Sequence, residues 1–257
     1  MAQLKLEKRG HTALITMSNP PANTWTRDTL TQLRDAVKSL DQDKNIYALV
    51  ITGEGDKFFS AGADLKLFAD GDKAIASDMA RIFGEAFETL SAFSGVSIAA
   101  INGYAMGGGL EVALACDIRI AEQQAQMALP EAKVGLLPCA GGTQNLAWLV
   151  GEGWAKRMIL CGERLGAEKA LQIGLVEEVV ATGMALENAL ALADKVAEQS
   201  PSSVTACKKL IQQGRSGTMQ SALPLERELF VGLFDTKDQV EGVQAFLDKR
   251  KANWVNG

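Results

Sequence analysis

Histidine is almost absent from this sequence, which holds only His11 among its 257 residues. His11 follows Gly10 between two short segments with strand-like alternation, a position typical of a turn residue. Mechanisms in which a histidine activates a serine or cysteine are therefore nearly excluded. If the chain is an enzyme, we expect carboxylates to carry its protons.

Cysteine is scarce, and dinucleotide and nucleotide motifs are missing. The four cysteines, Cys116, Cys139, Cys161 and Cys207, are widely spaced and form no C-x-x-C pair. This spacing disfavours zinc and redox motifs, so we expect reduced thiols and no bound metal. Neither a P-loop nor a G-x-G-x-x-G motif occurs, so nucleotide hydrolysis and NAD binding have no support.

Long apolar runs and an excess of positive charge are also missing. No stretch approaches the ~18 uninterrupted apolar residues of a membrane span, and residues 1–9 lack the apolar core of a signal peptide. We therefore expect a cytoplasmic protein with no membrane partner. The net charge of −5 argues against broad binding to nucleic acid, and we expect no nucleic acid partner.

What the chain does contain is an alternation of strand-like and helix-like segments. Apolar residues alternate on both sides of Gly10, which predicts a β-hairpin. Helical spacing from Thr26 is followed by the buried-strand pattern of residues 47–51, and further helices and strands follow. The remaining predicted strands are 97–101 and 117–121, and the remaining predicted helices are 75–90, 146–150, 155–160 and 185–196. After Pro201 the pattern changes to three consecutive helices.

The most informative stretch is residues 102–111, which contains three consecutive glycines, Gly107 to Gly109. Apolar runs on both sides predict a strand, a glycine turn and a buried helix. Uncovered N–H groups at a helix start, with the positive end of the helix dipole, favour an oxyanion. Glu111 lies three residues after Gly108 and so on the same helix face, which suggests acid–base chemistry on a carbonyl compound. The alternative is that the glycines only allow close packing of a helix on a strand.

Two further segments add to this pattern. Small residues at 60–63 allow a ligand to approach the backbone, although a plain surface turn has the same composition. Residues 127–144 form a predicted loop punctuated by proline and glycine. In this loop Glu131 follows Pro130, where a glutamate can also simply stabilise the first turn of a helix.

Residues 59–66, 102–117 and 130–144 together resemble the crotonase or enoyl-CoA hydratase superfamily. The similarity in order and spacing covers nearly the whole chain, as far as Trp254. The resemblance implies an α/β fold with a core of repeated ββα turns that form a spiral with two nearly perpendicular sheets. It assigns residues 1–200 to this core and its active site, and 201–257 to a C-terminal helical region for oligomerisation. The implied partners are an acyl-CoA substrate and copies of the same chain, in a homotrimer or homohexamer.

The resemblance also assigns roles to residues of the site. The backbone N–H groups of Ala63 and Gly108 match the oxyanion hole for the thioester oxygen of an acyl-CoA. Phe230 and Lys249 match positions that can contact acyl or CoA groups, and whether they do so across a subunit boundary stays open. A core aromatic and a solvated lysine are their structural alternatives. The segment that lines the path of adenine and pantetheine comprises Ala61, Ala63, Asp64, Leu65 and Lys66.

Glu111 and Glu131 match the two acid–base positions of members that hydrate a double bond. The implied reaction is the reversible hydration of a trans-2-enoyl-CoA to a 3-hydroxyacyl-CoA, in fatty-acid or related acyl-CoA degradation, with no metal or cofactor. Double-bond isomerisation and dehydration of a specialised acyl-CoA stay open as alternatives, as does a non-catalytic scaffold that binds CoA or RNA. We expect Asp117 to be a structural hydrogen-bond partner.

The sequence departs from the family pattern at two places. Cys139 follows Pro138 where the family often has glycine, and a residue with a Cβ has fewer backbone conformations. Residues 23–26 also differ from the commoner pattern of the family. The first difference affects the shape of the active-site loop and the acyl preference, and the second affects contacts with CoA.

Overall fold

Within residues 3–215 and 217–257, which the computed structural model describes, the strands form two sheets. The larger sheet has six strands in the order β1-β2-β3-β5-β7-β10. These strands are β1 (Gln3–Arg9), β2 (Thr12–Ser18), β3 (Ala48–Gly53), β5 (Val96–Ile101), β7 (Ile118–Glu122) and β10 (Glu178–Val180). β1 and β2 form the predicted hairpin around Gly10, and the other neighbours are parallel.

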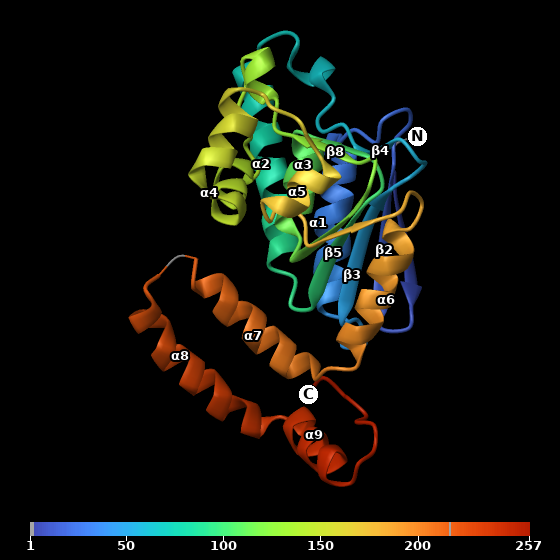
Figure 1. The fold of residues 1–257 in the computed structure, drawn as a ribbon, viewed down its shortest axis with the longest axis vertical. Coiled ribbons are helices and arrows are strands. Elements are labelled where there is room, and N and C mark those ends of the chain that lie inside the picture. The colour runs from blue at the N-terminus through green and yellow to red at the C-terminus, as the bar shows by residue number, and fades with distance from the viewer. Residues whose placement is uncertain (1–2, 216) are drawn as a thin grey trace.

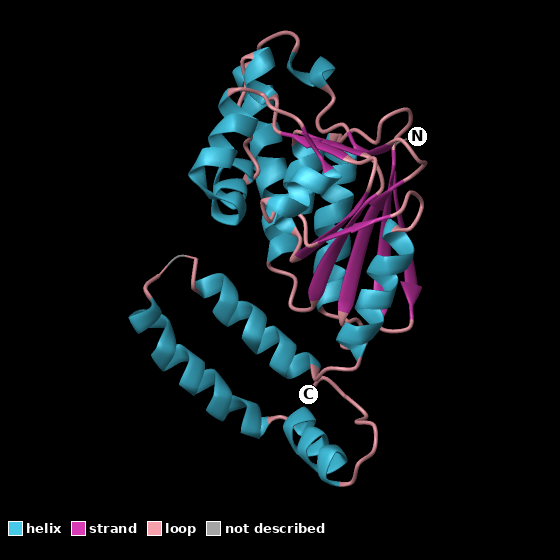
Figure 2. Ribbon diagram, viewed as in Figure 1, coloured by secondary structure: helices cyan, strands magenta, loops and turns pink. Residues whose placement is uncertain are grey.

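The smaller sheet has the order β4-β6-β8-β9 and lies across one end of the larger sheet (Figure 2). Its strands are β4 (Phe58–Ser60), β6 (Tyr104–Met106), β8 (Gln126–Ala128) and β9 (Leu165–Gly166). Three times the chain runs from a strand of the larger sheet to one of the smaller sheet and then into a helix. The units are β3-β4-α2, β5-β6-α3 and β7-β8-α4, with α2 (Lys73–Ser91), α3 (Gly108–Ala115) and α4 (Gly142–Leu160). This repetition is the predicted ββα spiral.

Helices cover both faces of the larger sheet. Ile15 and Ile51 pack in one core with residues of α2, α3, α4 and α1 (Arg27–Asp41), while Leu14 and Val50 pack in a second core with α6 (Ala185–Ala197). Because neighbouring residues of a strand point to opposite faces, these strands are apolar throughout, as buried parallel strands are. Figure 1 shows α1 and α6 on opposite sides of the sheet.

Local signals in the sequence explain where several helices begin and break. Thr26 caps α1 because its hydroxyl accepts from the N–H of Thr29, and the Thr29 hydroxyl accepts from the N–H of Thr26. α4 contains a break at Gly151, whose φ of 76° lies in the left-handed region, so the two predicted helical patterns there are two arms of one element. The other short elements are α5 (Ala167–Gln172) and the 3₁₀ helices η1 (Leu65–Phe68), η2 (Glu131–Val134) and η3 (Leu233–Asp235).

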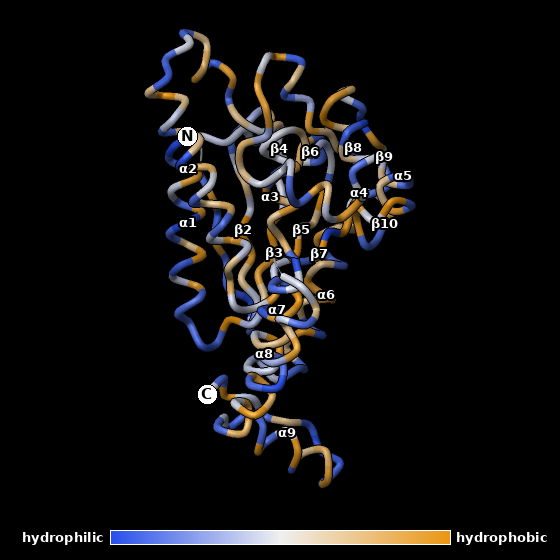
Figure 3. Tube along the Cα trace, turned by 90° about the vertical axis from the view of Figure 1, so that its left-hand side faces the viewer, coloured by the Kyte–Doolittle hydropathy of each residue, from blue (hydrophilic) through white to orange (hydrophobic). Residues whose placement is uncertain are grey.

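The chain ends in the three predicted helices, α7 (Pro201–Gln213), α8 (Met219–Gly232) and α9 (Lys237–Leu247). They extend away from the sheets, and hydrophobic segments run along them (Figures 1 and 3). α7 begins at the predicted domain boundary, although the division into two domains stays a prediction. Among the described residues, no helix combines the length and hydropathy needed to cross a membrane.

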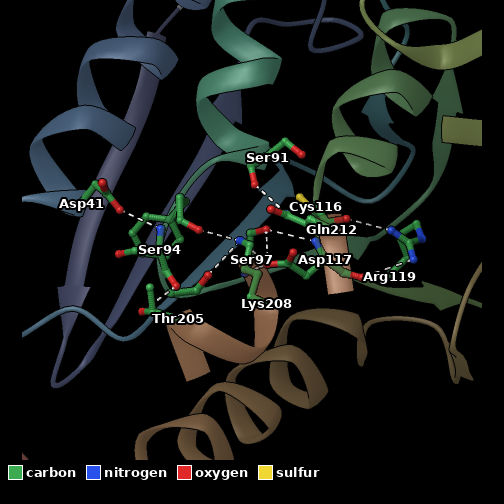
Figure 4. A network of polar contacts seen from close by, with 12 residues as sticks. Asp41, Ser91, Ser94, Ser97, Cys116, Asp117, Arg119, Thr205, Lys208 and Gln212 are labelled. Atoms are coloured by element: carbon green, nitrogen blue, oxygen red, sulfur yellow. Dashed lines mark hydrogen bonds and ion pairs between the residues drawn. The ribbon is translucent and has the colours of Figure 1, made fainter. Parts of the chain in front are cut away.

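A polar network joins α7 to the core (Figure 4). Lys208 donates from Nζ to the carbonyls of Phe93 (2.6 Å) and Gly95 (2.9 Å) and to Asp117 Oδ2 (2.7 Å). The same Asp117 oxygen accepts from the N–H and the hydroxyl of Ser97. Asp117 is therefore a structural hydrogen-bond partner, as expected, and it fixes the loop between α3 and β7 to both β5 and α7.

Candidate active site

The start of α3 approaches β4 and the loop after it so closely that only glycine fits. A Cβ on Gly109 would lie 2.1 Å from the carbonyl oxygen of Ser60. A Cβ on Gly62 would lie 2.6 Å from the carbonyl oxygen of Met106 and 3.0 Å from the amide nitrogen of Gly108. The distances to the two carbonyl oxygens are shorter than a real Cβ contact allows. The glycines therefore bring the segment around Ala63 against the first residues of α3.

Hydrogen bonds hold the segment that carries Ala63. The Ser60 hydroxyl donates to the carbonyl of Asn23 (2.7 Å) and accepts from the N–H of Gly62 (3.2 Å). Trp25 donates from its backbone N–H to the Gly62 carbonyl at 2.8 Å. Ser60 and Trp25 are fully buried. The loop is thus fixed by residues on either side of Ala63, while Ala63 itself keeps a free amide.

The two predicted oxyanion-hole amides lie at this junction. Neither the N–H of Ala63 nor the N–H of Gly108 donates a hydrogen bond to any of the described residues. Gly108 is the first residue of α3, so its N–H also lies at the positive end of the helix dipole. The pair is suited to a partly negative oxygen.

Glu111 is buried on the same helix, and its position is fixed by two backbone amides. Its Oε1 accepts from the N–H groups of Ala140 (2.8 Å) and Gly142 (2.9 Å). Burial raises the pKa of Glu111 above 4.5, and these two hydrogen bonds act in the opposite direction because they favour the carboxylate. Its Oε2 has no fixed partner among the described residues and is available to a ligand.

Glu131 lies close to Glu111 but has a different environment. A Cβ on Gly107 would lie 3.2 Å from Glu131 Oε1, which places this carboxyl against the start of α3. Both of its carboxyl oxygens are buried and lack a hydrogen-bond partner among the described residues. Burial raises the pKa of Glu131 to about 7, and the Glu111 carboxylate adds to the rise. At neutral pH this group therefore holds a proton for much of the time.

These groups face a cavity of about 970 Å³. The cavity is lined by the predicted residues of η1 and the loop before it, the start of α3 and the loop after β8. The predicted site residues among them are Ala61, Ala63, Asp64, Leu65, Lys66, Gly108, Glu111 and Glu131. Segments more than sixty residues apart in sequence are thus brought to one cavity.

Cys139 also lines the cavity, beside the two glutamates. Cys139 is exposed overall, but its partial burial at the cavity wall raises the pKa of the thiol to about 11, with further contributions from Glu111 and Glu131, so the sulfur stays protonated. The loop keeps the two amides that bind Glu111 although Cys139 stands where the family often has glycine.

Phe230 and Lys249 do not line the cavity within this chain. Phe230 lies on α8 with 62% of its surface exposed, and its ring packs edge-on against Phe234. Lys249 follows α9 with a φ of 57°. Their predicted contacts with a ligand require another subunit and stay predictions.

Comparison with known proteins agrees with this geometry. The profile of the Enoyl-CoA hydratase/isomerase family matches residues 7–257. The chain belongs to this family. It is 40% identical to 2,3-dehydroadipyl-CoA hydratase of Escherichia coli (strain K12), with 97% of each chain covered. It is 36% identical to short-chain-enoyl-CoA hydratase of Clostridium acetobutylicum, with 96% of this chain and 95% of the relative covered.

Solved structures also superpose on this chain over most of its length. A structure of Pseudomonas aeruginosa DspI has a TM-score of 0.96 at 68% identity and covers 98% of this chain and 96% of its own. An enoyl-CoA hydratase from Bacillus anthracis has a TM-score of 0.95 at 34% identity, with 99% of each chain covered. The spiral core and the helical region are therefore those of the family fold.

Some residues of the site were not predicted from the sequence. The amides of Ala140 and Gly142, which hold Glu111, lie about thirty positions further along the chain. Phe83 was likewise not predicted to shape the site. The Gly141-Gly142 pair was the only available signal, because paired glycines in a loop often allow a backbone amide to approach another group.

Proposed function

We propose that this protein catalyses the reversible addition of water to a trans-2-enoyl-CoA, giving a 3-hydroxyacyl-CoA, within acyl-CoA degradation. One observation carries the proposal: two carboxyl groups, one held by two backbone amides and one buried without a hydrogen-bond partner among the described residues, face the same cavity as two free amide donors. A conjugated thioester needs this combination, because charge develops on its oxygen when water adds to C3. The family's hydratases support the proposal at 36–40% identity.

The amides of Ala63 and Gly108 donate to the thioester oxygen and make C3 more electrophilic. Glu111, with one oxygen fixed by two amides, takes a proton from water through its other oxygen as the hydroxyl bonds to C3. Glu131 gives its proton to C2 as the double bond is lost. The pair ends with one proton, now on Glu111, so proton exchange between the carboxyls restores the starting state.

The proposal includes no metal and no cofactor apart from the CoA thioester substrate. Addition of water changes no overall oxidation state, so the reaction needs no electron acceptor. We further propose a cytoplasmic homotrimer or homohexamer in which Phe230 and Lys249 contact the acyl or CoA group of a neighbouring subunit. Their exposure in the single chain is compatible with that role.

Isomerisation of the double bond is the second candidate, because the family includes isomerases. Isomerases of this kind often work with one glutamate, so the presence of both Glu111 and Glu131 favours hydration. The test is product analysis after incubation of the purified protein with crotonyl-CoA and, separately, with a 3-enoyl-CoA. A 3-hydroxy product from crotonyl-CoA supports the proposal, a shifted double bond alone replaces it with isomerisation, and no turnover of either supports a non-catalytic scaffold.

A further inference from the structure

One face of α2 runs along the cavity from the reaction centre outward. Phe83, Ala80 and Ala76 all line the cavity, and their spacing of three and four residues places them on the same side of the helix. The ring of Phe83 lies at the oxyanion hole, since a Cβ on Gly108 would be 3.0 Å from Phe83 Cε1. From a helical rise of 1.5 Å per residue, Ala80 lies about 4.5 Å and Ala76 about 10.5 Å further along the axis.

Elements other than α2 also contribute apolar side chains to the cavity. η1 contributes Leu65 and Phe68, and the loop that begins in η2 contributes Val134, Leu136 and Leu137. Of these, Leu65, Val134, Leu136 and Leu137 are large apolar side chains with 44–67% of their surface exposed. Exposed apolar residues gathered around a cavity indicate a surface that an apolar ligand covers.

The positively charged side chains around the cavity do not come from α2. Its cationic side chains, Lys66 and Lys133, come from η1 and η2, and α2 contributes only the two alanines and Phe83. A CoA moiety carries phosphates and amides, which suit the lysines and polar backbone. A hydrocarbon chain suits the α2 wall because it gains from leaving water there and loses no hydrogen bond.

We propose that α2 measures the length of the acyl chain, with Ala80 and Ala76 as the residues that determine specificity. This inference rests on the proposed hydratase function and assigns the substrate class as linear enoyl-CoA with chains longer than crotonyl. The small side chains at Ala80 and Ala76 leave a channel two helical turns long beyond Phe83. Ala80 is half-buried and Ala76 is exposed, so the channel opens to the surface near the start of α2.

The test compares Ala80→Phe and Ala76→Phe, using crotonyl-, hexenoyl-, octenoyl- and dodecenoyl-CoA as trans-2 substrates. Ala80→Phe should lower the octenoyl-to-crotonyl ratio of kcat/KM at least roughly tenfold, the scale of a few methylene contacts in a pocket. Ala76→Phe should spare that ratio and lower the dodecenoyl-to-octenoyl ratio instead. The control is Ala74→Phe on the same helix, where Ala74 is exposed and does not line the cavity.

The decisive result is the chain length at which kcat/KM falls, which should be shorter for Ala80→Phe than for Ala76→Phe. Equal losses for all substrates in Ala80→Phe would overturn the proposal, because they would place the pantetheine arm or the reacting carbons along α2. The proposal would also be overturned if kcat/KM fell at the same chain length in both variants. The same holds if Ala74→Phe lowered the octenoyl-to-crotonyl ratio as much as Ala80→Phe does. If Ala80→Phe does not fold, Ala80→Leu must give a smaller change of the same ratio.

Binding of saturated acyl-CoA separates this inference from the proposed reaction. Calorimetric titration with butyryl- and octanoyl-CoA needs no turnover. If the protein hydrates nothing but binds octanoyl-CoA more tightly than butyryl-CoA, and Ala80→Phe removes the difference, the channel stands and the proposed function falls. If turnover is normal and the unmodified protein binds both equally, the channel is wrong and the function stands.

Discussion

At the level of single residues, the two glutamates differ because their surroundings differ. Glu111 has two amide donors that favour its carboxylate, whereas both oxygens of Glu131 are buried without a partner. This difference supports the proposed division of roles, with Glu111 as the base and Glu131 as the acid, since proton affinity follows burial and hydrogen bonding. The sequence predicted both residues but not this division of roles, which depends on amides contributed by a distant loop.

Replacement of either glutamate tests whether the pair acts as a unit. Glu111→Gln and Glu131→Gln keep nearly the same shape, so each variant should fold and bind CoA thioesters. Each should lose roughly two or more orders of magnitude in hydration rate, as expected for a general acid or base. The double variant should lose much less than the product of the two, because one water serves both carboxyls.

Hydration rates of all four proteins decide this point, with circular dichroism and ligand binding as controls. Near-normal turnover in a single variant would make that glutamate structural. If Glu131→Gln keeps near-normal turnover, so that only Glu111 is required, the result favours a one-glutamate isomerase.

Glu131 should also make stability depend on pH. Its pKa rises from 4.5 to about 7 on folding, so between these values the folded protein binds a proton that the unfolded chain has released. The free energy of unfolding therefore falls as pH rises through this window and levels off above it. Urea unfolding at several pH values should show a flatter curve for Glu131→Gln. Exposed Glu168 on α5 is the control, and an equal flattening in Glu168→Gln would contradict the assignment to Glu131.

At the level of elements, periodicity predicted the segments long enough to show it. The hairpin of β1 and β2, helices α1 and α2, and strands β3, β5 and β7 all appear where alternation or helical spacing placed them. β6 and β8 did not: residues 104–106 were expected in a glycine turn, and Met127 and Ala128 in a loop. Three residues are too few for a period-two pattern, and these strands exist because they pair with each other and their neighbours.

The closeness of α3 to the loop after β4 predicts a difference between two glycines. Gly62 and Gly55 both have a φ of 87°, so alanine strains the backbone similarly at each. Only Gly62 also faces atoms that a Cβ would strike, whereas Gly55 has none within 4 Å. Gly62→Ala should displace the Ala63 and Gly108 amides from each other and lower kcat roughly 100-fold, the scale for losing one oxyanion donor.

Gly55→Ala should keep near-normal kcat and show only the loss of stability that the shared strain causes. Rates with saturating substrate and thermal unfolding of both variants give the comparison. Similar rates in the two variants would mean that the two amides do not depend on close contact at Gly62.

At the level of the whole molecule, the core and the helical region differ in how they bury apolar side chains. The sheets and α1–α6 bury most of their large apolar residues, with exceptions such as Leu6, Trp148 and Leu160, while the segment from α8 to α9 leaves its largest apolar side chains in solvent. Phe230 is 62% exposed, Phe234 57% and Phe246 84%. α7 is tied to the core by Lys208 and Asp117, so the exposed helices are held in a defined place beyond it (Figure 4). Helical spacing alone predicted the apolar stripes but could not show that this chain leaves them uncovered.

Exposure of this kind predicts that a second copy of the chain covers α8 and α9. Light scattering at micromolar concentration should give the mass of a trimer or hexamer, and a monomer would contradict this assembly. Phe246→Asp should raise the dissociation constant of the assembly at least roughly tenfold, because an unpaired charge is costly to bury at an interface. The control is Gln244→Asp, which adds a charge at an exposed polar position of the same helix. If both variants keep the mass and stability of the unmodified assembly, Phe246 lies outside the interface and the contact surface must be sought on α8.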